Sequence, residues 1–441
     1  MRINRLSIQN FKKYANQEFV FDPHFNLLIG NNGAGKTTIL DAVAVAAGVW
    51  LLDVPDPNLS SQCSISPSDV RQTFRLRGER DQTGFFHLPV IVCADGLIQE
   101  RACQWKRTLE KNRTRNVEAR SARALIKLCY QQGNDGDEMV LPVIAYYGAG
   151  RASYSSYKRS ASHEKTKNNQ SNRWAAFYDC LSERIRFPDI KVWFETEAYA
   201  RGNRDGQWRP GFNVVRWALL QCLPGLSEIW FNPDIKQMMF EIDGRSQPLD
   251  HLSMGQRMMA GLVADIAIKM VTQNAHLIPP GNTEYATREA CPSVLRETPG
   301  VVLIDELDAH LHPSWQRRIV SDLKRTFPQI QFICATHSPQ LIGELQPNEI
   351  MLLSDDGNAS YPPRSFGLDS NRVLEEIMEA SPRNQEIKAK LNEMFSLIDN
   401  EDLDGAKQKK AELESELGDN DPELTYAESL ISFLEMPLTE E

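Results

Sequence analysis

A glycine-rich stretch at residues 30–38, Gly-Asn-Asn-Gly-Ala-Gly-Lys-Thr-Thr, has residue types and spacing suited to holding phosphate. Its glycines tolerate positive φ and close approach, so backbone N–H groups can curl around phosphate oxygens as in a P-loop. Lys36 would bring a mobile ammonium to the β- and γ-phosphates, and the Thr37 hydroxyl would complete the shell of a Mg²⁺ ion. The residues expected to bind the nucleotide are Gly30, Asn31, Asn32, Gly33, Ala34, Gly35, Lys36, Thr37 and Thr38.

Two elements must position this loop. The apolar residues 25–29 before it predict a buried strand, and the residues after Thr38 predict a helix whose N-terminus faces the phosphates. This order of strand, loop and helix is the context that makes a P-loop match specific. Lys12, Lys13 and Tyr14 lie in a predicted turn between the first two strands, where they either reach the nucleotide or form a solvated turn.

Two further predicted strands end in residues suited to hydrolysis. Val301–Ile304 is apolar and β-branched, and it leads into Asp305 and Glu306. The first carboxylate would hold Mg²⁺ through water, and the second would orient and activate the attacking water. Phe332–Ala335 leads into His337, at the sheet edge where ligands bind in open α/β sheets. We predict that Asp305, Glu306 and His337 are the catalytic residues, with His337 sensing the γ-phosphate.

A short turn, Ser-Met-Gly-Gln at residues 253–256, opens a predicted helix that runs toward Met270. Taken alone, this turn is an N-cap followed by a flexible glycine. Its place between the P-loop and the carboxylate pair changes that interpretation. Together the motifs resemble the ATP-binding-cassette type of P-loop ATPase, in which two heads sandwich ATP. The resemblance implies an ATPase that uses ATP and Mg²⁺ and forms a homodimer around the nucleotide.

The same resemblance gives roles to single residues. Asp305 and Glu306 correspond to the Walker B motif, with Asp305 and Thr37 as the Mg²⁺ ligands, and Asp308 corresponds to the D-loop. Met254 replaces a glycine of the usual signature, and no Q-loop glutamine is identified. The signature residues that would serve the nucleotide on the partner's P-loop are Ser253, Gly255 and Gln256.

The residues after the carboxylate pair narrow the resemblance. The sequence His310-Leu311-His312-Pro313 is typical of overcoming-lysogenization-defect and RecF-like ATPases. Within that group the chain is most similar to the ATPases of Septu-type and related retron anti-phage systems, on residues 141–148 and 366–378. That similarity implies an HNH nuclease as partner. The two imidazoles do not predict a metal site, because no Cys or Glu cluster completes a shell.

We predict an α/β fold, an ABC-ATPase (RecF/OLD-like) P-loop head with an inserted α+β subdomain and a C-terminal helical module. Helical apolar spacing is expected at 174–200 and 212–223. No heptad pattern between Lys36 and Ser253 is long enough for a coiled-coil arm. The expected parts are the head N-lobe at 1–95, the inserted subdomain at 96–240, which returns to the core near 142–150, the head C-lobe at 241–365 and the helical module at 366–441.

The sequence assigns no single function to four segments. Residues 101–127 hold nine Lys or Arg against two Glu, and they either contact the DNA backbone or form a solvated face. The basic, serine-rich residues 151–173 and the Pro- and Gly-rich residues 272–300 are expected to be exposed loops. Arg151 is a candidate for the nucleotide or dimer face. A tail of three predicted helices, at 386–398, 402–417 and 422–434, packs on the head, recruits a partner or builds a higher oligomer.

The amino-acid composition limits which classes of protein remain possible. With 441 residues, 24% charged side chains and a net charge of −10, the chain suits two or three ordinary domains and not a wholly basic nucleic-acid binder. Eight scattered cysteines, without a C-x-x-C pair, indicate reduced thiols. The sequence shows neither a signal peptide nor an apolar run long enough to span a membrane. We therefore expect a cytoplasmic protein with no membrane partner.

These observations converge on an ATP-hydrolysing subunit of an anti-phage defence system that senses infection and controls an associated HNH nuclease. The main alternative is a RecF-like DNA-repair ATPase that binds DNA directly, and a third is a non-hydrolysing ATP-binding scaffold. No two-metal nuclease set of Glu and Asp-x-Asp follows His337. We therefore expect any DNA cleavage to belong to another polypeptide.

Overall fold

The structure is a computed structural model that describes residues 1–54, 64–77, 81–111, 113–134, 138–152, 173–279, 290–418 and 420–435. The chain divides into two compact units, Met1–Leu368 and Asp369–Glu441. The finer division into four parts stays a prediction. The expected loop at 151–173 lies almost entirely outside the described residues, as does the middle of the 272–300 segment.

A six-stranded sheet forms the centre of the first unit. Its order is β16 (Ala359–Ser360), β15 (Ile350–Leu353), β3 (Phe25–Gly30), β14 (Ile330–Ala335), β13 (Gly300–Ile304) and β9 (Val143–Tyr147). All neighbouring strands pair in parallel except β16, which is antiparallel to β15. β9, β13 and β14 are buried along their whole length, as parallel strands covered on both faces should be.

The strand order brings three chemically important loops together. β14 lies between β3 and β13, although it follows both in the sequence. Because these strands are parallel, the segments that follow them emerge at one edge of the sheet. The predicted strands at 25–29, 301–304 and 332–335 are confirmed, and their carboxyl ends carry the P-loop, the carboxylate pair and the His337 turn.

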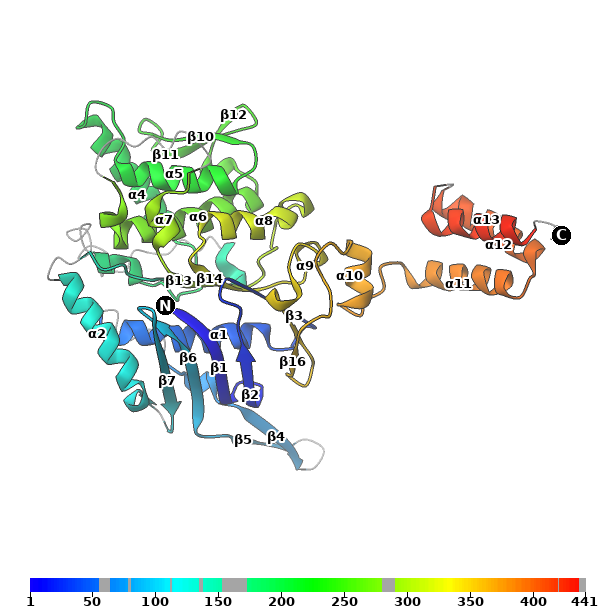
Figure 1. Cartoon of the computed structure of the whole chain (residues 1–441), viewed down its shortest axis with the longest axis horizontal. Coiled ribbons are helices and arrows are strands. Elements are labelled where there is room, and N and C mark those ends of the chain that lie inside the picture. Colours follow the sequence, from blue (N-terminus) through cyan, green and yellow to red (C-terminus); the bar gives the residue numbers. More distant parts are fainter. Residues whose placement is uncertain are drawn as a thin grey trace. The chain divides into compact units, whose positions relative to one another are not determined.

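The helix that follows the P-loop, α1 (Lys36–Ala47), is held between two sheets. It contacts β13 and β14 on one side and the second sheet on the other, as the blue helix in Figure 1 illustrates. The Trp105 indole N–H donates to the carbonyl oxygen of Ala46 at 3.0 Å, which ties the second sheet to the end of α1. This antiparallel sheet has the order β2 (Tyr14–Val20), β1 (Arg2–Phe11), β6 (Val90–Ile98), β7 (Arg101–Leu109) and β8 (Thr114–Arg115).

Helices cover the opposite face of the central sheet (Figure 1). There α6 (Met254–Gln273) contacts β9, and α5 (Pro210–Cys222) contacts both α6 and α8 (Pro313–Thr326). A small antiparallel sheet lies beside α5 and α4 (Phe187–Gly202), in the order β10 (Leu226–Asn232), β11 (Gln237–Ile242) and β12 (Arg245–Pro248). The first unit also contains α2 (Arg120–Asn134), α7 (Ser293–Glu297), α9 (Pro339–Ile342) and the hairpin of β4 (Gln72–Arg77) and β5 (Asp81–Phe86).

The helical prediction for 174–200 is wrong in its first half. Arg173–Phe177 is a short 3-10 turn, and α4 begins only at Phe187. Asp179 and Glu183 adopt positive φ between them, which interrupts a right-handed helix. Pro188 then fits the first turn of α4, where a missing N–H costs nothing. Apolar spacing alone did not reveal this break.

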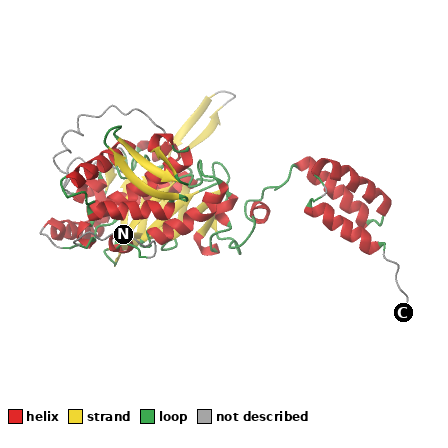
Figure 2. Cartoon of the chain, turned by 90° about the horizontal axis from the view of Figure 1, so that it is seen from above, coloured by secondary structure: helices red, strands yellow, loops and turns green. Residues whose placement is uncertain are grey.

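The second unit contains α10 (Ser370–Glu376) and a three-helix bundle of α11 (Gln385–Asp399), α12 (Leu403–Leu417) and α13 (Pro422–Leu434). Figure 2 shows the three helices of this bundle side by side. Asn384, Asp402 and Asp421 cap their N-termini, so the three predicted helices are confirmed with their starts. The core of the bundle consists of Leu391, Met394, Ile398, Ala406, Leu413, Leu424, Ala427 and Ile431. Across the described residues, no helix is long and apolar enough to cross a bilayer.

Candidate functional site

The P-loop of this chain forms a cradle that only glycine can complete. A Cβ atom at Gly30 would lie 2.5 Å from the carbonyl oxygen of Leu353, and Gly35 has a φ of 105°. Gly35 is also the N-cap of α1, whose first-turn N–H groups have no acceptor within the helix. Backbone donors and the positive end of the helix dipole therefore face the same place. The cradle fits a phosphate group.

Lys36 is buried within this loop, with 8% of its surface exposed. Its Nζ donates to the carbonyl oxygens of Gly30 at 2.7 Å and Asn31 at 3.2 Å. Burial lowers the pKa of Lys36, while the carboxylates of Asp305 and Glu306 act in the opposite direction. A phosphate oxygen is a better partner for this ammonium than the two carbonyls, because it carries negative charge.

Thr37 and Asp305 bring two oxygen donors together from separate parts of the sequence. The Thr37 hydroxyl donates to Oδ2 of Asp305 at 2.7 Å. The Asp305 N–H donates to the Tyr147 carbonyl oxygen at 2.8 Å, which extends the pairing of β13 with β9 by one residue. These oxygens suit Mg²⁺, which prefers hard ligands. No group of three or more His, Cys, Asp or Glu among the described residues could hold a metal alone.

Glu306 follows Asp305 directly but differs from it in exposure to solvent. Asp305 is buried, whereas Glu306 is exposed. Glu306 has a φ of 50°, a left-handed conformation that few residues other than glycine adopt. Such a conformation at the end of a buried strand requires the surrounding structure to hold it.

A chain of hydrogen bonds joins the D-loop and the His337 turn. The Thr336 hydroxyl donates to Oδ1 of Asp308 at 2.5 Å, and the Ser338 N–H donates to Thr336 Oγ1 at 3.0 Å. The Ser338 hydroxyl donates to Oε1 of Gln316 at 2.5 Å, and Gln316 Nε2 donates to the Leu311 carbonyl oxygen at 2.9 Å. His337 is exposed at the end of β14. Asp308 and His337 thus lie just after β13 and β14, and their roles stay predictions. Gln316, which no motif indicated, links their loops.

The signature turn begins α6 as a capping box. The Gln256 N–H donates to Ser253 Oγ at 3.2 Å, and the Ser253 N–H donates to Oε1 of Gln256 at 3.0 Å. Ser253 is exposed, whereas Gly255 is buried. A Cβ at Gly255 would lie 2.4 Å from the carbonyl oxygen of His310, so this glycine allows α6 to approach the segment after the carboxylate pair. Its role toward a partner's nucleotide stays a prediction.

The turn between β1 and β2 supports the P-loop. Lys13 Nζ donates to the carbonyl oxygens of Gly33 and Ala34, both at 2.8 Å, and the Tyr14 hydroxyl donates to Ala34 at 3.1 Å. Lys12 instead forms an ion pair with Asp41 of α1. The interpretation of this segment as a merely solvated turn is therefore wrong.

Arg151 does not lie on the nucleotide or dimer face, which corrects the expectation for it. Only 5% of its surface is exposed. Its guanidinium donates to the backbone carbonyl oxygens of Asp305 and Glu306. The position just past β9 indicated proximity to the site, but the sequence carried no signal for the direction of the side chain.

His312 and the basic segment 101–127 are the remaining charged residues considered in the sequence. His312 Nδ1 accepts the Ser314 N–H at 3.3 Å and caps α8. In the basic segment 101–127, Arg107 is fully buried, and Arg123 and Lys127 both pair with Asp53. The segment is thus partly structural. Its exposed basic residues without an ion pair among the described residues are Arg101, Lys111, Arg113 and Arg120.

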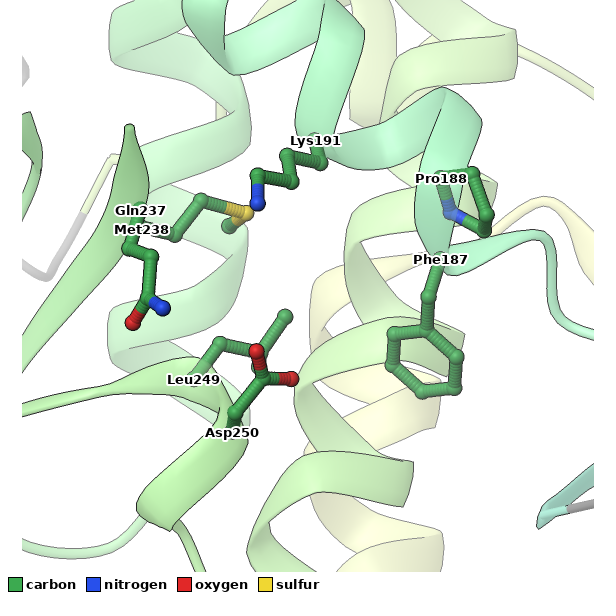
Figure 3. A pocket seen from close by; sticks show the side chains of 7 residues that line it. All are labelled: Phe187, Pro188, Lys191, Gln237, Met238, Leu249 and Asp250. Atoms are coloured by element: carbon green, nitrogen blue, oxygen red, sulfur yellow. The ribbon is translucent and has the colours of Figure 1, made fainter. Parts of the chain in front are cut away.

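A cavity of about 240 Å³ lies apart from the P-loop, between the start of α4 and the turn before the signature (Figure 3). The side chains of Lys191 and Asp250 border it from different elements. None of the predicted nucleotide-binding or catalytic residues lines it. Those residues occupy the edge of the central sheet, where Thr37, Glu306 and His337 are exposed. The cavity is lined by Phe187, Pro188, Lys191, Gln237, Met238, Leu249 and Asp250.

Comparison with known proteins matches both halves of this site. A family model described as "AAA domain" matches residues 5–191, and one described as "AAA domain, putative AbiEii toxin, Type IV TA system" matches residues 236–343. The chain is 26% identical over 478 residues to "Retron Vc95 probable ATPase" of Vibrio cholerae serotype O1 biovar El Tor, with 93% of this chain and 86% of that protein covered. It is 51% identical over 63 residues to "Septu protein PtuA" of Bacillus mycoides (strain KBAB4), with 14% of this chain and 9% of that protein covered.

A solved structure is also similar. It is the crystal structure of the SmcHead bound to the C-winged helix domain of ScpA, with 13% sequence identity. The match covers 82% of this chain and 98% of that chain, with a TM-score of 0.47.

Proposed function

Because this chain belongs to the AAA-type P-loop ATPases, hydrolyses ATP and has a retron ATPase and Septu PtuA among its relatives, we propose that it is the ATPase subunit of an anti-phage defence system. In this proposal the protein senses infection, and its bound nucleotide determines whether it activates an HNH nuclease that is a separate polypeptide. The alternative of a non-hydrolysing scaffold is dropped, since the chain is an ATPase.

The proposed chemistry uses the residues at the edge of the central sheet. Thr37 and Asp305 would hold Mg²⁺, which would supply positive charge against the phosphates. Lys36 exchanges its bonds with the P-loop carbonyls for bonds to phosphate oxygens. Glu306 orients the attacking water and accepts its proton, and His337 contacts the γ-phosphate.

A second head completes the site in this proposal. Thr37, Glu306 and His337 are exposed in a single head. Phosphoryl transfer to one bound water benefits when bulk solvent is excluded from the site. Ser253 is also exposed, at the N-terminus of the 20-residue helix α6. The positive end of that helix suits the γ-phosphate of a nucleotide on another head. We therefore propose a homodimer around two ATP molecules, with Ser253, Gly255 and Gln256 acting in trans.

One contact carries the assignment of the hydrolytic site. The Thr37 hydroxyl and the Asp305 carboxylate are 2.7 Å apart although 268 positions separate them in sequence. A P-loop without this partner could bind phosphate but would lack the second Mg²⁺ ligand. Glu306, the next residue, is exposed beside it.

A Glu306→Gln variant tests the hydrolytic role. It keeps the size of the side chain but removes the proton acceptor, so we expect phosphate release to fall at least about 100-fold, with ATP affinity kept. Glu344→Gln, at another exposed glutamate of the head, is the matched control and should retain full turnover. Unchanged turnover in Glu306→Gln would contradict the assignment.

The partner is tested by purification from the native locus, with the full chain and with a chain that ends at residue 383. The bundle α11–α13 has its own core, so its removal should leave the head folded. We expect a small HNH protein to co-purify with the full chain and to be lost from the shorter one. A full chain that purifies without any nuclease would contradict this part of the proposal.

A second candidate function, direct DNA binding by a RecF-like repair ATPase, has support from exposed basic residues of the segment 101–127. Arg101, Lys111, Arg113 and Arg120 are exposed and form no ion pair within the described part of the chain. Exposed cations contact phosphate backbones without sequence preference. Reversal of these four charges should abolish duplex retention if this function is correct, whereas reversal of the exposed Lys388 should not.

A further inference from the structure

The turn that carries Asp305 and Glu306 rests on a buried arginine. Arg151 Nη2 donates to the Glu306 carbonyl oxygen at 2.7 Å, and Nη1 donates to the carbonyl oxygens of Asp305 and, at 3.4 Å, Gly148. These partners are backbone groups rather than carboxylates. The planar guanidinium suits this arrangement, because it presents several donors in a fixed fork.

The position of this arginine follows from where the sheet ends. The Asp305 N–H still pairs with Tyr147, the last residue of β9. The pairing of β13 with β9 ends there, and the Glu306 carbonyl oxygen accepts the Ala309 N–H at 2.9 Å. Buried backbone carbonyls require a donor. Arg151, four residues after Tyr147, donates to the Asp305 carbonyl oxygen and gives the Glu306 carbonyl oxygen a second donor beside the Ala309 N–H.

The contact coincides with the unusual backbone of Glu306. Its φ of 50° is disfavoured for a residue with a Cβ, so the turn needs outside contacts to keep it. The direction of a side chain depends on φ and ψ, and the Glu306 carboxylate would point elsewhere in an ordinary conformation. A donor fixed on the Glu306 carbonyl oxygen therefore fixes where the carboxylate points.

The charge of Arg151 is compatible with its burial. Burial lowers the pKa of Arg151, and the neighbouring carboxylates of Glu306 and Asp305 act in the opposite direction. A buried cation is retained only where such compensation exists. Replacement by a neutral side chain would remove the donors to the carbonyl oxygens of Asp305 and Glu306.

We propose that Arg151 is a positioning residue for ATP hydrolysis, which holds Glu306 in the left-handed conformation that directs its carboxylate to the attacking water. Arg151 contacts neither nucleotide nor water in this proposal and acts only through the backbone of Glu306. The proposal rests on the role of Glu306 given under the proposed function.

Kinetics of Arg151→Ala and Arg151→Lys in the full chain provide the first test. We expect Arg151→Ala to lower kcat about 10- to 100-fold with KM for ATP changed less than about threefold, because the P-loop is untouched. Arg151→Lys should recover part of kcat, since one ammonium can still donate to these carbonyls.

Arg173 offers a matched control, because it also donates to two backbone carbonyl oxygens, those of Gln273 at 2.9 Å and Met139 at 2.5 Å. Arg173→Ala should lower the melting temperature as Arg151→Ala does but keep kcat. A similar loss of kcat in both variants would assign Arg151 a merely structural role and overturn the proposal.

The double variant Arg151→Ala/Glu306→Gln separates this proposal from the one on which it rests. If Arg151 acts through Glu306, the double variant turns over ATP as slowly as Glu306→Gln alone, within about twofold. Multiplied losses would show that Arg151 acts elsewhere and would overturn the proposal. Full turnover in Glu306→Gln would instead overturn the assignment of Glu306 itself.

Discussion

The hydrolytic edge of the head and the tail bundle α11–α13 are stabilised by different kinds of contact. At the edge, the cations of Lys13, Lys36 and Arg151 all donate to backbone carbonyl oxygens, so side chains determine the course of the main chain. In the tail, an apolar core joins three helices, and its charged side chains form mostly exposed ion pairs. The edge therefore depends on particular atoms, whereas the tail depends on apolar volume and helix caps.

The two regions also differ in charge. Residues 384–441 contain 16 Asp or Glu and 5 Lys, so the net charge of −10 originates almost entirely in this part of the chain. Like charges at this density favour solubility and disfavour self-association of the tail alone. The four predictions that follow test whether the edge and the tail respond differently to substitution.

The largest effect is expected for Lys36→Ala. Loss of the ammonium removes the cation that meets the β- and γ-phosphates, so turnover should fall at least about 1000-fold and ATP affinity with it. Phosphate release and equilibrium binding measure both quantities. Lys388→Ala, at an exposed lysine of the tail, should retain turnover within about twofold. More than a tenth of normal turnover in Lys36→Ala would contradict the P-loop assignment.

A glycine pair gives a second contrast. In Gly255→Ala the new Cβ would lie 2.4 Å from the His310 carbonyl oxygen, so α6 must shift and turnover should fall about 10-fold. In Gly405→Ala the Cβ would meet the Asp402 carboxylate, which caps α12, so a loss of about 1 kcal/mol at the cap offsets the gain of about 1 kcal/mol from alanine, and turnover should not change. Turnover and thermal melting compare the two. Equal ATP turnover in both variants would show that the close approach of α6 to the His310 carbonyl oxygen is not needed for turnover.

A cavity in the tail should leave the head active. Leu424→Ala removes a fully buried side chain from the bundle and should cost about 2–4 kcal/mol of its stability. Calorimetry should show an earlier transition for the second unit, with phosphate release unchanged. Loss of ATP turnover in this variant would show that the two units are not energetically separate.

The smallest effect concerns acid. Burial works to raise the pKa of Asp421, but the hydrogen bond from Arg383 at 2.7 Å outweighs it, and the pKa lies below its ordinary value. The stability that Asp421 contributes is therefore complete above its ordinary pKa and is lost as the pH falls through the lowered one. Asp421→Asn keeps a capping oxygen and should cost at most about 1 kcal/mol at neutral pH. Helical CD against pH should show a weaker acid transition in this variant, and an identical transition would contradict the prediction.

The position of the motif residues at the carboxyl edge of the central sheet was predictable, because the chemistry proposed for each of them suits few residue types. Thr37, Asp305 and His337 lie at one edge, as a parallel sheet requires of residues that follow its strands. Lys13 and Arg151 could not be assigned in the same way. Their contacts depend on which backbone carbonyl oxygens the fold brings within reach, and that is a property of the folded chain rather than of local sequence.

Helix periodicity predicted the tail well, since α11, α12 and α13 combine apolar spacing with Asn or Asp caps. It failed at 174–200, where the positive φ of Asp179 and Glu183 interrupts the helix before α4 begins. The function of the tail was less predictable than its structure. Apolar spacing builds a core whatever partner the outer surface meets, so only the binding experiment addresses that partner.

The central claim, that each ATP site combines the P-loop of one head with the signature of another, has a direct test. Lys36→Ala and Ser253→Arg should each be inactive alone, because one lacks the phosphate cation and the other blocks the signature. When the two variants are co-expressed and pair at random, about a quarter of the sites combine an intact P-loop with an intact signature. We predict that ATP turnover recovers toward this fraction. Co-expressed protein that stays as inactive as either variant alone would contradict the composite site.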